Sequence, residues 1–173
     1  MQTFLTSFIF LFSISLYAMT PFEQNCEKLS KKQISPSNRL HELFKLHWNY
    51  QMTEYPESAT YAGFPGQNHR WTDLSLEAIE RRKKELQAPF KVLLSINRSK
   101  LKNADQLNYD LFKRNLEIAL EGQKYPSEYL PLNQLDGVHI NVPQLLVIMP
   151  HHTKLHYQDI ILRLEALPVL VEQ

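Results

Sequence analysis

The chain has 173 residues, with 19 lysines and arginines against 18 aspartates and glutamates, and a formal net charge of +1 at pH 7. This balance argues against a dedicated nucleic-acid binder, and a hydrophobic content of 43% with 11% aromatic residues excludes wholesale disorder. The four glycines argue against a hairpin-rich β fold and against a glycine-loop nucleotide site. The length suits one ordinary domain.

The chain begins with an apolar segment that is typical of an export signal. Residues 4–19 are almost wholly apolar or hydroxylic, and the first charged side chain is Glu23. This run is shorter than the roughly 20 residues that a membrane-spanning helix needs. We predict a signal peptide over residues 1–18 and an exported protein, periplasmic or secreted, without stable membrane insertion after cleavage. A buried core helix and an uncleaved anchor are the alternatives for this run.

Residues 19–36 are expected to form a flexible mature N-terminus. Cys26 is the only cysteine of the sequence, so the chain forms no internal disulfide. We interpret Cys26 as an incidental thiol in a mobile segment. An exported chain without disulfides favours a bacterial envelope protein.

The sequence after residue 36 has a helical pattern. A first helix, capped by Ser37 or Asn38, is predicted to reach Glu54, because Pro56 disfavours its continuation. At 100° per residue, one face of this helix carries the apolar residues Leu40, Leu43, Phe44, Trp48 and Tyr50. We expect that face to pack on the core.

A short helix over residues 56–62 and an ordered loop over 63–72, anchored by Trp71, are expected next. A longer helix is predicted over 75–97, with a kink at Pro89 because proline removes a backbone donor. Its core-facing stripe consists of Leu76, Ile79, Leu86, Phe90, Leu93 and Leu94.

A third long helix is predicted from Asn103, with Gln106 in the reciprocal capping position, to Gly122. Its charges fall on one narrow stripe, so the helix is expected to be mostly buried through Leu107, Leu111, Phe112, Leu116, Ile118 and Leu120. No helical period survives over residues 123–142, which predicts a long apolar-rich loop.

The last part of the sequence predicts two further helices. Pro143 is expected to start a short one, and Thr153 to cap a last one that runs into Pro168. The fold class is therefore all-α, with about five or six helices and a long apolar loop.

Histidines give the nearest approach to a metal site. His41-Glu42 begins like a zinc-protease helix, but Lys45 occupies the position of the second histidine ligand. His152 and His156 do have the i, i+4 spacing, yet Thr153 as the cap places His152 outside the helix. We therefore expect these histidines to be ordinary polar residues.

The remaining polar groups favour structural roles. His47, Gln51 and Glu54 lie on the apolar face of the first helix, where a hydrogen-bonded network is expected. The basic run 81–84 wraps around its helix and is interpreted as solvated surface. From the residues alone, no catalytic, cofactor-binding or metal-binding residue is assigned.

Six stretches of the sequence resemble a known family when they are taken in order and spacing. They are Leu43-Phe44-(x)3-Trp48 leading to Glu54-x-Pro56-Glu57-x-Ala59-Thr60; Arg70-Trp71-Thr72-Asp73-Leu74-Ser75; Asn108-Tyr109-Asp110-Leu111-Phe112; Leu130-Pro131-Leu132-Asn133-Gln134 followed by Gly137-Val138-His139; Leu145-Leu146-(x)2-Met149-Pro150; and Ala166-Leu167-Pro168. Over roughly residues 38–173 they resemble the N-terminal part of the bacterial family called "domain of unknown function 885".

The resemblance implies an exported, largely helical protein several times longer than this chain. Its fold is similar to the helical zinc peptidases of the angiotensin-converting-enzyme and thimet type, in which the zinc helix follows the region matched here. Zinc and a peptide substrate are therefore implied only for full-length relatives, and no cofactor for this chain. By analogy, one loop is expected to line the substrate cleft through Asn133, Gln134, Gly137 and His139.

Two hypotheses from different classes follow. In the first, residues 37–173 are an incomplete helical domain: the N-terminal fragment of a zinc-metallopeptidase-like protein, inactive as it stands. The alternative is a self-contained helical binding module of the envelope, without catalytic activity, that uses Trp48, Trp71 and the 125–142 loop for recognition. A pseudogene remnant or an annotation break would give the same sequence.

Overall fold

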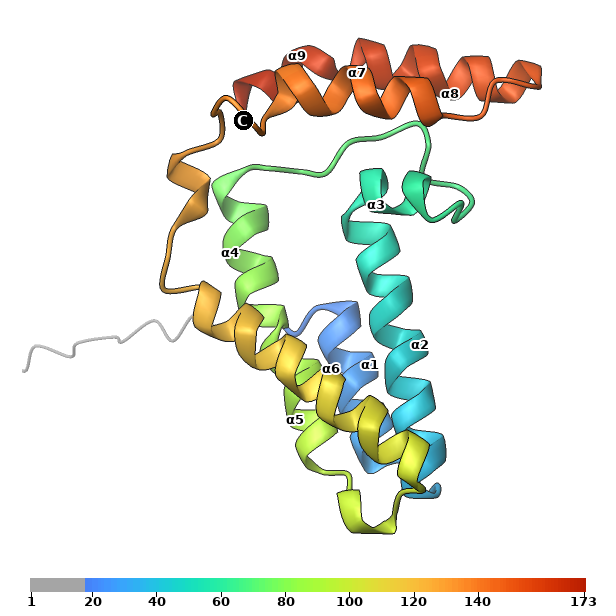
Figure 1. The fold of residues 1–173 in the computed structure, drawn as a ribbon, viewed down its shortest axis with the longest axis vertical. Helices are drawn as coiled ribbons and strands as arrows, with labels where there is room; N and C mark the ends of the chain where they lie inside the picture. The colour runs from blue at the N-terminus through green and yellow to red at the C-terminus, as the bar shows by residue number, and fades with distance from the viewer. Residues whose placement is uncertain (1–17) are drawn as a thin grey trace, which may run out of the picture.

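The computed structural model describes residues 18–173 (Figure 1), so the predicted signal peptide lies, apart from Ala18, outside the described residues and stays a prediction. Every regular element in the described part is helical, which confirms the all-α class. Seven of these α-helices have eight or more residues, and α3 and α9 have six. The α-helices are α1 (Pro21–Lys31), α2 (Pro36–Glu54), α3 (Pro56–Tyr61), α4 (Leu76–Glu85), α5 (Gln87–Leu94), α6 (Asn103–Gly122), α7 (Val138–Ile148), α8 (Lys154–Glu165) and α9 (Leu167–Glu172).

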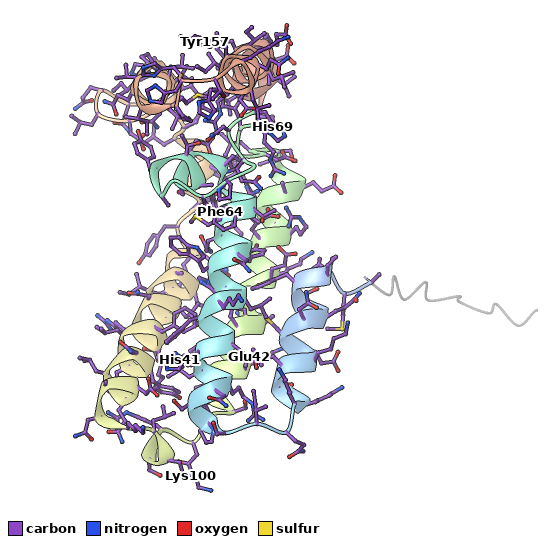
Figure 2. The ribbon with its side chains drawn as sticks, turned by 90° about the vertical axis from the view of Figure 1, so that its right-hand side faces the viewer. His41, Glu42, Phe64, His69, Lys100 and Tyr157 are labelled. Atoms are coloured by element: carbon purple, nitrogen blue, oxygen red, sulfur yellow. The ribbon has the colours of Figure 1, made fainter. Side chains whose placement is uncertain are left out.

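The helices form two layers. Figure 1 shows α1, α2, α4, α5 and α6 as a long bundle, and α7, α8 and α9 side by side across its upper end. In the view turned by 90°, α7 and α8 are seen nearly end-on while α2 still runs vertically, so the upper helices lie crosswise to the bundle (Figure 2). The short α3 sits at the top of α2, beneath the upper helices. None of the helices within residues 18–173 is long and apolar enough to cross a membrane.

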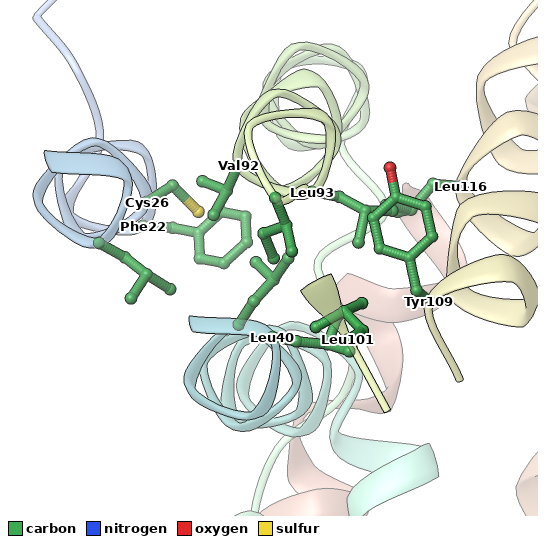
Figure 3. Close-up of a cluster of buried hydrophobic side chains, with 11 residues drawn as sticks. Phe22, Cys26, Leu40, Val92, Leu93, Leu101, Tyr109 and Leu116 are labelled. Atoms are coloured by element: carbon green, nitrogen blue, oxygen red, sulfur yellow. The ribbon is translucent and has the colours of Figure 1, made fainter. Parts of the chain in front are cut away.

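The main hydrophobic core lies inside the bundle (Figure 3). It is formed by side chains from α1, α2, α5, α6 and the turn between α5 and α6: Phe22, Cys26, Leu29, Leu40, Leu43, Val92, Leu93, Ile96, Leu101, Tyr109 and Leu116. Among the described residues, none from α7, α8 or α9 belongs to this cluster. The upper layer is therefore held by other contacts.

Helix α1 corrects the expectation of a flexible segment over residues 19–36. Thr20 and Glu23 form a reciprocal capping box, in which the Thr20 amide donates to Glu23 Oε2 at 2.8 Å. Phe22 stacks on Tyr50, with ring centroids 3.8 Å apart. Cys26 is only 1% exposed, and burial raises the pKa of its thiol to about 12. The thiol is thus a core side chain of an ordered helix.

Helix α2 begins slightly earlier than predicted and presents the predicted face to the core except at Trp48. Its cap is Ser35, whose Oγ accepts from the amide of Asn38 at 3.2 Å, with Pro36 in the first turn. Leu40 and Leu43 are fully buried as expected, but the Trp48 side chain is 48% exposed. The expectation that Trp48 faces the core is wrong.

The predicted long helix over 75–97 is divided into α4 and α5. Pro89 has no N–H to donate to the carbonyl of Glu85, four residues earlier, and its ring crowds that carbonyl, so α4 ends at Glu85. The buried side of α4 carries Ala78, Arg82 and Glu85, while Leu76 is exposed. The expected stripe is therefore wrong at Leu76, and also at Leu94, which is exposed at the end of α5.

Helix α6 has the predicted bounds but not the predicted burial. Its buried residues are Asp105, Tyr109 and Leu116. The apolar side chains of Leu107, Leu111 and Ile118 are each more than half exposed, so the expectation of a mostly buried helix is wrong. The reciprocal cap also does not form, because Gln106 Nε2 donates to the carbonyl of Leu101. The bundle covers one side of α6 only.

Helix α7 begins at Val138, five residues before the predicted start at Pro143. Pro143 lies inside the helix, and the connecting loop after α6 shortens to residues 123–137 with a 3₁₀ turn at Ser127–Tyr129. The prediction at Thr153 is confirmed, since its side chain accepts from the amide of His156 at 3.2 Å. Pro168 stands at the start of α9, where a missing N–H has little consequence.

Candidate functional site

The residues expected to line a cleft lie in the segment that leads into α7. Asn133 Oδ1 accepts from the amides of Leu135 and Asp136 at 2.8 and 3.0 Å, which folds this segment into a tight turn. Asn133, Gln134 and His139 are exposed, and Gly137 is buried. None of these four residues lines the pocket between the bundle and the upper helices. These four residues are therefore neighbours along the chain, but they do not surround that pocket.

Asp136 and Gly137 fix the start of α7. Asp136 Oδ1 accepts from the side chain of Asn141 at 2.7 Å and from the amide of Gly137 at 2.8 Å, and these two hydrogen bonds lower the pKa of that carboxyl. Gly137 has φ 131°, and a Cβ there would stand 2.6 Å from Leu132 Cδ2. The positive φ strains any residue with a side chain, so glycine is favoured at this position.

A pocket lies between the two layers. Its volume is about 550 Å³, and its walls are α3 with the following loop on one side and the end of α7 on the other. Thr60, Phe64 and Asn68 line it from below, and His151 and His152 line it from the upper layer. Figure 2 shows Phe64 directly beneath the upper helices.

The histidines beside this pocket are held by local hydrogen bonds. The amide of His152 donates to Nδ1 of His156 at 3.1 Å, and Nδ1 of His151 lies 3.3 Å from the carbonyl of Met149. Within residues 18–173 no three histidine, cysteine, aspartate or glutamate side chains are placed to hold a metal ion. The donor set does not fit zinc.

His41 and Glu42 both form contacts with residues outside the pocket. His41 Nε2 lies 2.8 Å from Asp105 Oδ1, and Glu42 pairs with Lys32 at 2.7 Å. Both lie on the lower half of α2, far from the pocket (Figure 2). Ser37 donates to the other oxygen of Asp105, so the serine and the histidine both bind the aspartate and do not form a nucleophile–base pair. This cluster ties α2 to α6.

Arg163 of α8 is the most deeply buried charged side chain in the described part, with 0% exposure. Its Nε and Nη2 donate to the carbonyl of Arg70 at 2.9 and 2.7 Å, Nη1 donates to Thr60 Oγ1 at 3.0 Å, and Nη2 also reaches the carbonyl of Gln67 at 3.3 Å. The Arg163 guanidinium stands 4.9 Å from the ring centroid of Trp71, whose Nε1 donates back to the Arg163 carbonyl at 2.6 Å. These contacts join the upper layer to α3 and its loop.

No salt bridge joins Arg163 to a carboxylate within residues 18–173. Burial therefore lowers the pKa of Arg163 to about 10, which still leaves it charged at pH 7. Four hydrogen bonds to oxygen atoms replace the lost hydration. The sequence did not single out this arginine; its one signal is a lone cation in the apolar run Ile160-Ile161-Leu162-Arg163-Leu164.

A second polar cluster connects α2 with α4. Arg81 pairs with Glu54 at 2.6 Å and with Glu85 at 2.8 Å, and Tyr50 donates to Glu85 at 2.7 Å. Arg82 is only 9% exposed and donates to the carbonyl of Asp73 at 2.7 Å. The expectation that the basic run 81–84 is solvated surface is wrong for Arg82, and Arg81 is only partly exposed.

The network expected around His47 forms only in part. Glu54 joins the cluster with Arg81, whereas His47 packs edge-on against Phe112, with ring centroids 5.0 Å apart. Burial lowers the pKa of His47 to about 4, so the imidazole is neutral at pH 7. His47 is an aromatic packing partner of α6 here.

Residues 56–173 match the model of the family described as "Bacterial protein of unknown function (DUF885)". The chain belongs to the DUF885 family. Helices α1 and α2 precede the matched region, although the motifs noted in the sequence begin in α2. No curated protein and no solved structure matches the chain.

Two DUF885 motif segments meet at Arg163. Glu57 of the first motif accepts from the Thr72 amide at 3.0 Å and also from the Thr72 hydroxyl, while Thr60 accepts from Arg163. Trp71 of the second motif donates to the Arg163 carbonyl. The motif residues in this part of the chain therefore build a structural junction beside the pocket.

Proposed function

We propose that this chain is the N-terminal helical part of an exported DUF885 protein whose whole fold is similar to the helical zinc peptidases of the angiotensin-converting-enzyme and thimet type. In this proposal the chain is a scaffold and does not carry the zinc-binding segment. Membership of the family and the all-helical fold support the proposal. The apolar run over residues 4–19 supports export to the periplasm or the medium.

The observation that carries the scaffold proposal is the apolar surface left open on α6 and the upper layer. Large hydrophobic side chains are exposed along these helices: Leu107, Leu111, Ile118, Val147, Ile148, Leu155, Tyr157, Ile161, Leu162, Leu164, Val169 and Val171. Contiguous apolar surface on a soluble protein commonly marks a contact with another polypeptide. Further helices of a longer chain would cover it.

Within residues 18–173 no group of side chains is placed to hold a zinc ion, so in this proposal the zinc ligands belong to another part of the whole protein. A peptide substrate belongs to the proposal only for the whole protein. The segment Asn133–His139 remains the proposed edge of its cleft, because Asn133, Gln134 and His139 stand exposed with their backbone fixed by the turn.

Metal analysis and a peptidase assay test the proposal. The purified chain is expected to contain far less than one zinc per molecule and to hydrolyse no peptide in a chelator-sensitive manner. Stoichiometric zinc with chelator-sensitive turnover would contradict it. The DNA after the last codon gives a second test: a His-Glu-x-x-x-His segment in any frame supports the longer protein.

Export is tested by fusing residues 1–30 to a reporter enzyme that is active only outside the cytoplasm. Reporter activity is expected, and a matched fusion in which Phe8, Phe10 and Phe12 are replaced by Asp should abolish it, because charges destroy the apolar core of a signal. Equal activity from both fusions would rule out this signal.

The second candidate function is a self-contained binding module of the envelope. Exposed aromatic side chains favour it: Trp48 on α2, and Tyr125 and Tyr129 in the loop after α6. Trp71 no longer belongs to this surface, because its indole N–H is used by the Arg163 carbonyl. A stable monomer in solution would favour the binding module over the scaffold.

A further inference from the structure

The upper layer (residues 138–173) has little in common with the bundle core. Its buried side chains are Leu145, Met149, Arg163 and Leu170, and none of these belongs to the hydrophobic cluster of the bundle. Helix α7 packs on the six-residue α3, and the covalent link to α6 is the loop 123–137, whose side chains are mostly exposed. A part of the molecule that shares no hydrophobic core with the bundle can open without unfolding the rest.

Beside the packing of α7 on α3, the buried hydrogen bonds between the two layers are concentrated at one residue of α8. Arg163 reaches the Arg70 carbonyl twice, the Gln67 carbonyl and Thr60 Oγ1, and accepts from Trp71 through its own carbonyl. Further hydrogen bonds lie at Gln173, which accepts from the Leu74 amide at 2.8 Å and donates to Asp73 Oδ1 at 3.0 Å, both in exposed positions. An exposed hydrogen bond of this kind contributes little, whereas the buried contacts of Arg163 form only when the layers are closed.

We propose that residues 138–173 open as one unit on the bundle, and that Arg163 is the latch that holds them closed. The 550 Å³ pocket lies across the same junction, with Thr60 and Phe64 on the bundle side and Met149 and His151 on the upper side. Opening the latch separates these walls. The latch therefore controls access to the pocket as well as the position of α7 and α8.

Hydrogen exchange of the full chain, read by mass spectrometry on peptides from each helix, tests this directly. In the unmodified chain, the backbone amides of α7 and α8 should be equally protected from exchange and less protected than those of α2 and α5. The reason is that the amides of α7 and α8 become exposed in the same opening motion. Equal protection of α7, α8, α2 and α5 would overturn the proposal without any variant.

Arg163→Met removes the donors and leaves the Arg70 and Gln67 carbonyls without them. Exchange in α7 and α8 should become at least about tenfold faster, while exchange in α2, α5 and α6 changes by less than about threefold. Arg98→Met is the control, since Arg98 pairs with Asp110 in exposed positions and lies in the 3₁₀ turn Arg98–Lys100. Figure 2 shows Lys100 at the end of the molecule opposite to the upper helices. The same acceleration in every helix, or none in α7 and α8, would show that Arg163 is not a local latch.

Trp71→Phe provides a milder variant in case Arg163→Met does not fold. It keeps an aromatic ring beside the guanidinium but deletes the hydrogen bond to the Arg163 carbonyl. A smaller acceleration, about twofold to fivefold, is expected in α7 and α8 alone. Acceleration spread evenly over the bundle would again overturn the proposal.

Discussion

Glu85 and Arg81 show at the scale of single residues why charges enter this interior. The Glu85 side chain is 3% exposed and accepts from Tyr50 and from Arg81. These interactions satisfy a carboxylate that would be costly to bury alone. Burial and the hydrogen bond to Glu85 raise the pKa of Tyr50, so its hydroxyl remains a donor at neutral pH. The cluster is stable only while each member is present.

Arg81→Met should therefore destabilise the protein. It leaves Glu85 without its cation, while Glu54 keeps Arg82 at 3.6 Å. Because Arg81 is itself partly exposed, the expected loss is about 1–3 kcal/mol of unfolding free energy. Urea unfolding followed by circular dichroism measures the loss. Arg98→Met is the control and should cause a much smaller change, because its ion pair is exposed. Equal effects of the two substitutions would contradict a structural role for the buried pair.

Asp105 gives a prediction for the pH dependence of stability. Hydrogen bonds from Ser37 and then His41 lower the pKa of its carboxyl in the folded state. A lowered folded pKa stabilises the protein above the unfolded value of about 3.9, and this contribution is lost as the pH falls through the folded pKa.

Asp105→Asn should therefore lower stability at pH 7, and the difference from the unmodified chain should shrink progressively below about pH 4. Unfolding free energies measured by urea titration from pH 7 to pH 3 check this. Ser37→Ala should act in the same direction, because it removes the first of the two donors. A difference that stays constant over the whole pH range would contradict the assignment.

At the scale of elements, helix ends are set by short local signals. Thr20, Ser35, Ser75 and Thr153 each accept from a backbone amide in the first turn of a helix, and Pro89 divides α4 from α5. The start of α7 depends on a different device. Gly137 has a positive φ that is strained for residues with a side chain, and Leu132 lies close to the position that a Cβ would occupy.

Gly137→Ala should therefore destabilise α7. The positive φ, together with the Pro131 carbonyl 3.1 Å from the added Cβ, predicts a loss of about 1–3 kcal/mol, because the exposed Leu132 side chain can move aside. Thermal unfolding, together with exchange in α7, measures it. Gly122→Ala is the matched control, because nothing lies within 4 Å of its added Cβ and helical glycine is less favourable than alanine. That control should be neutral or slightly stabilising. If Gly122→Ala lowers the unfolding free energy as much as Gly137→Ala does, backbone strain at Gly137 is not the cause.

At the scale of the whole molecule, the decisive feature is the apolar surface that the two layers leave open. Tyr157, Ile161 and Leu164 fall on one side of α8, within a narrow sector at 100° per residue, and all three are exposed. Exposed apolar side chains on neighbouring elements favour association with other polypeptide surfaces. This surface separates the scaffold proposal from the binding module.

The purified chain should therefore self-associate as its concentration rises, in sedimentation velocity experiments. Replacing Tyr157, Ile161 and Leu164 by Gln should weaken the association without loss of helicity. Replacing the exposed pair Glu27 and Lys31 on α1 by Gln should leave it unchanged. A monodisperse monomer with a cooperative melt would instead favour the self-contained binding module.

The all-α class, most helix ends and the family could be predicted because each depends on neighbouring residues. Caps, prolines and the terminal glycine of α6 act within one turn, and the DUF885 motifs are themselves local strings. The segment Asn133–His139 was expected to lie wholly in a loop, but Val138 and His139 belong to α7, and no pattern in the segment predicts what it faces. Arg163 was missed because a lone arginine in an apolar run does not indicate its acceptors, which lie about ninety residues earlier in the chain.

The sequence by itself determined the all-α class, most of the helices and the family, although α1 and the start of α7 were not predicted. Only the tertiary structure decided which face of each helix is buried. Leu107 and Trp48 have large apolar side chains, yet they are exposed, whereas the charged Arg82, Glu85 and Arg163 are buried. Hydrophobic periodicity describes what a helix could bury, but burial needs a partner surface. A charge enters the interior only where distant carbonyls, hydroxyls and opposite charges converge on it.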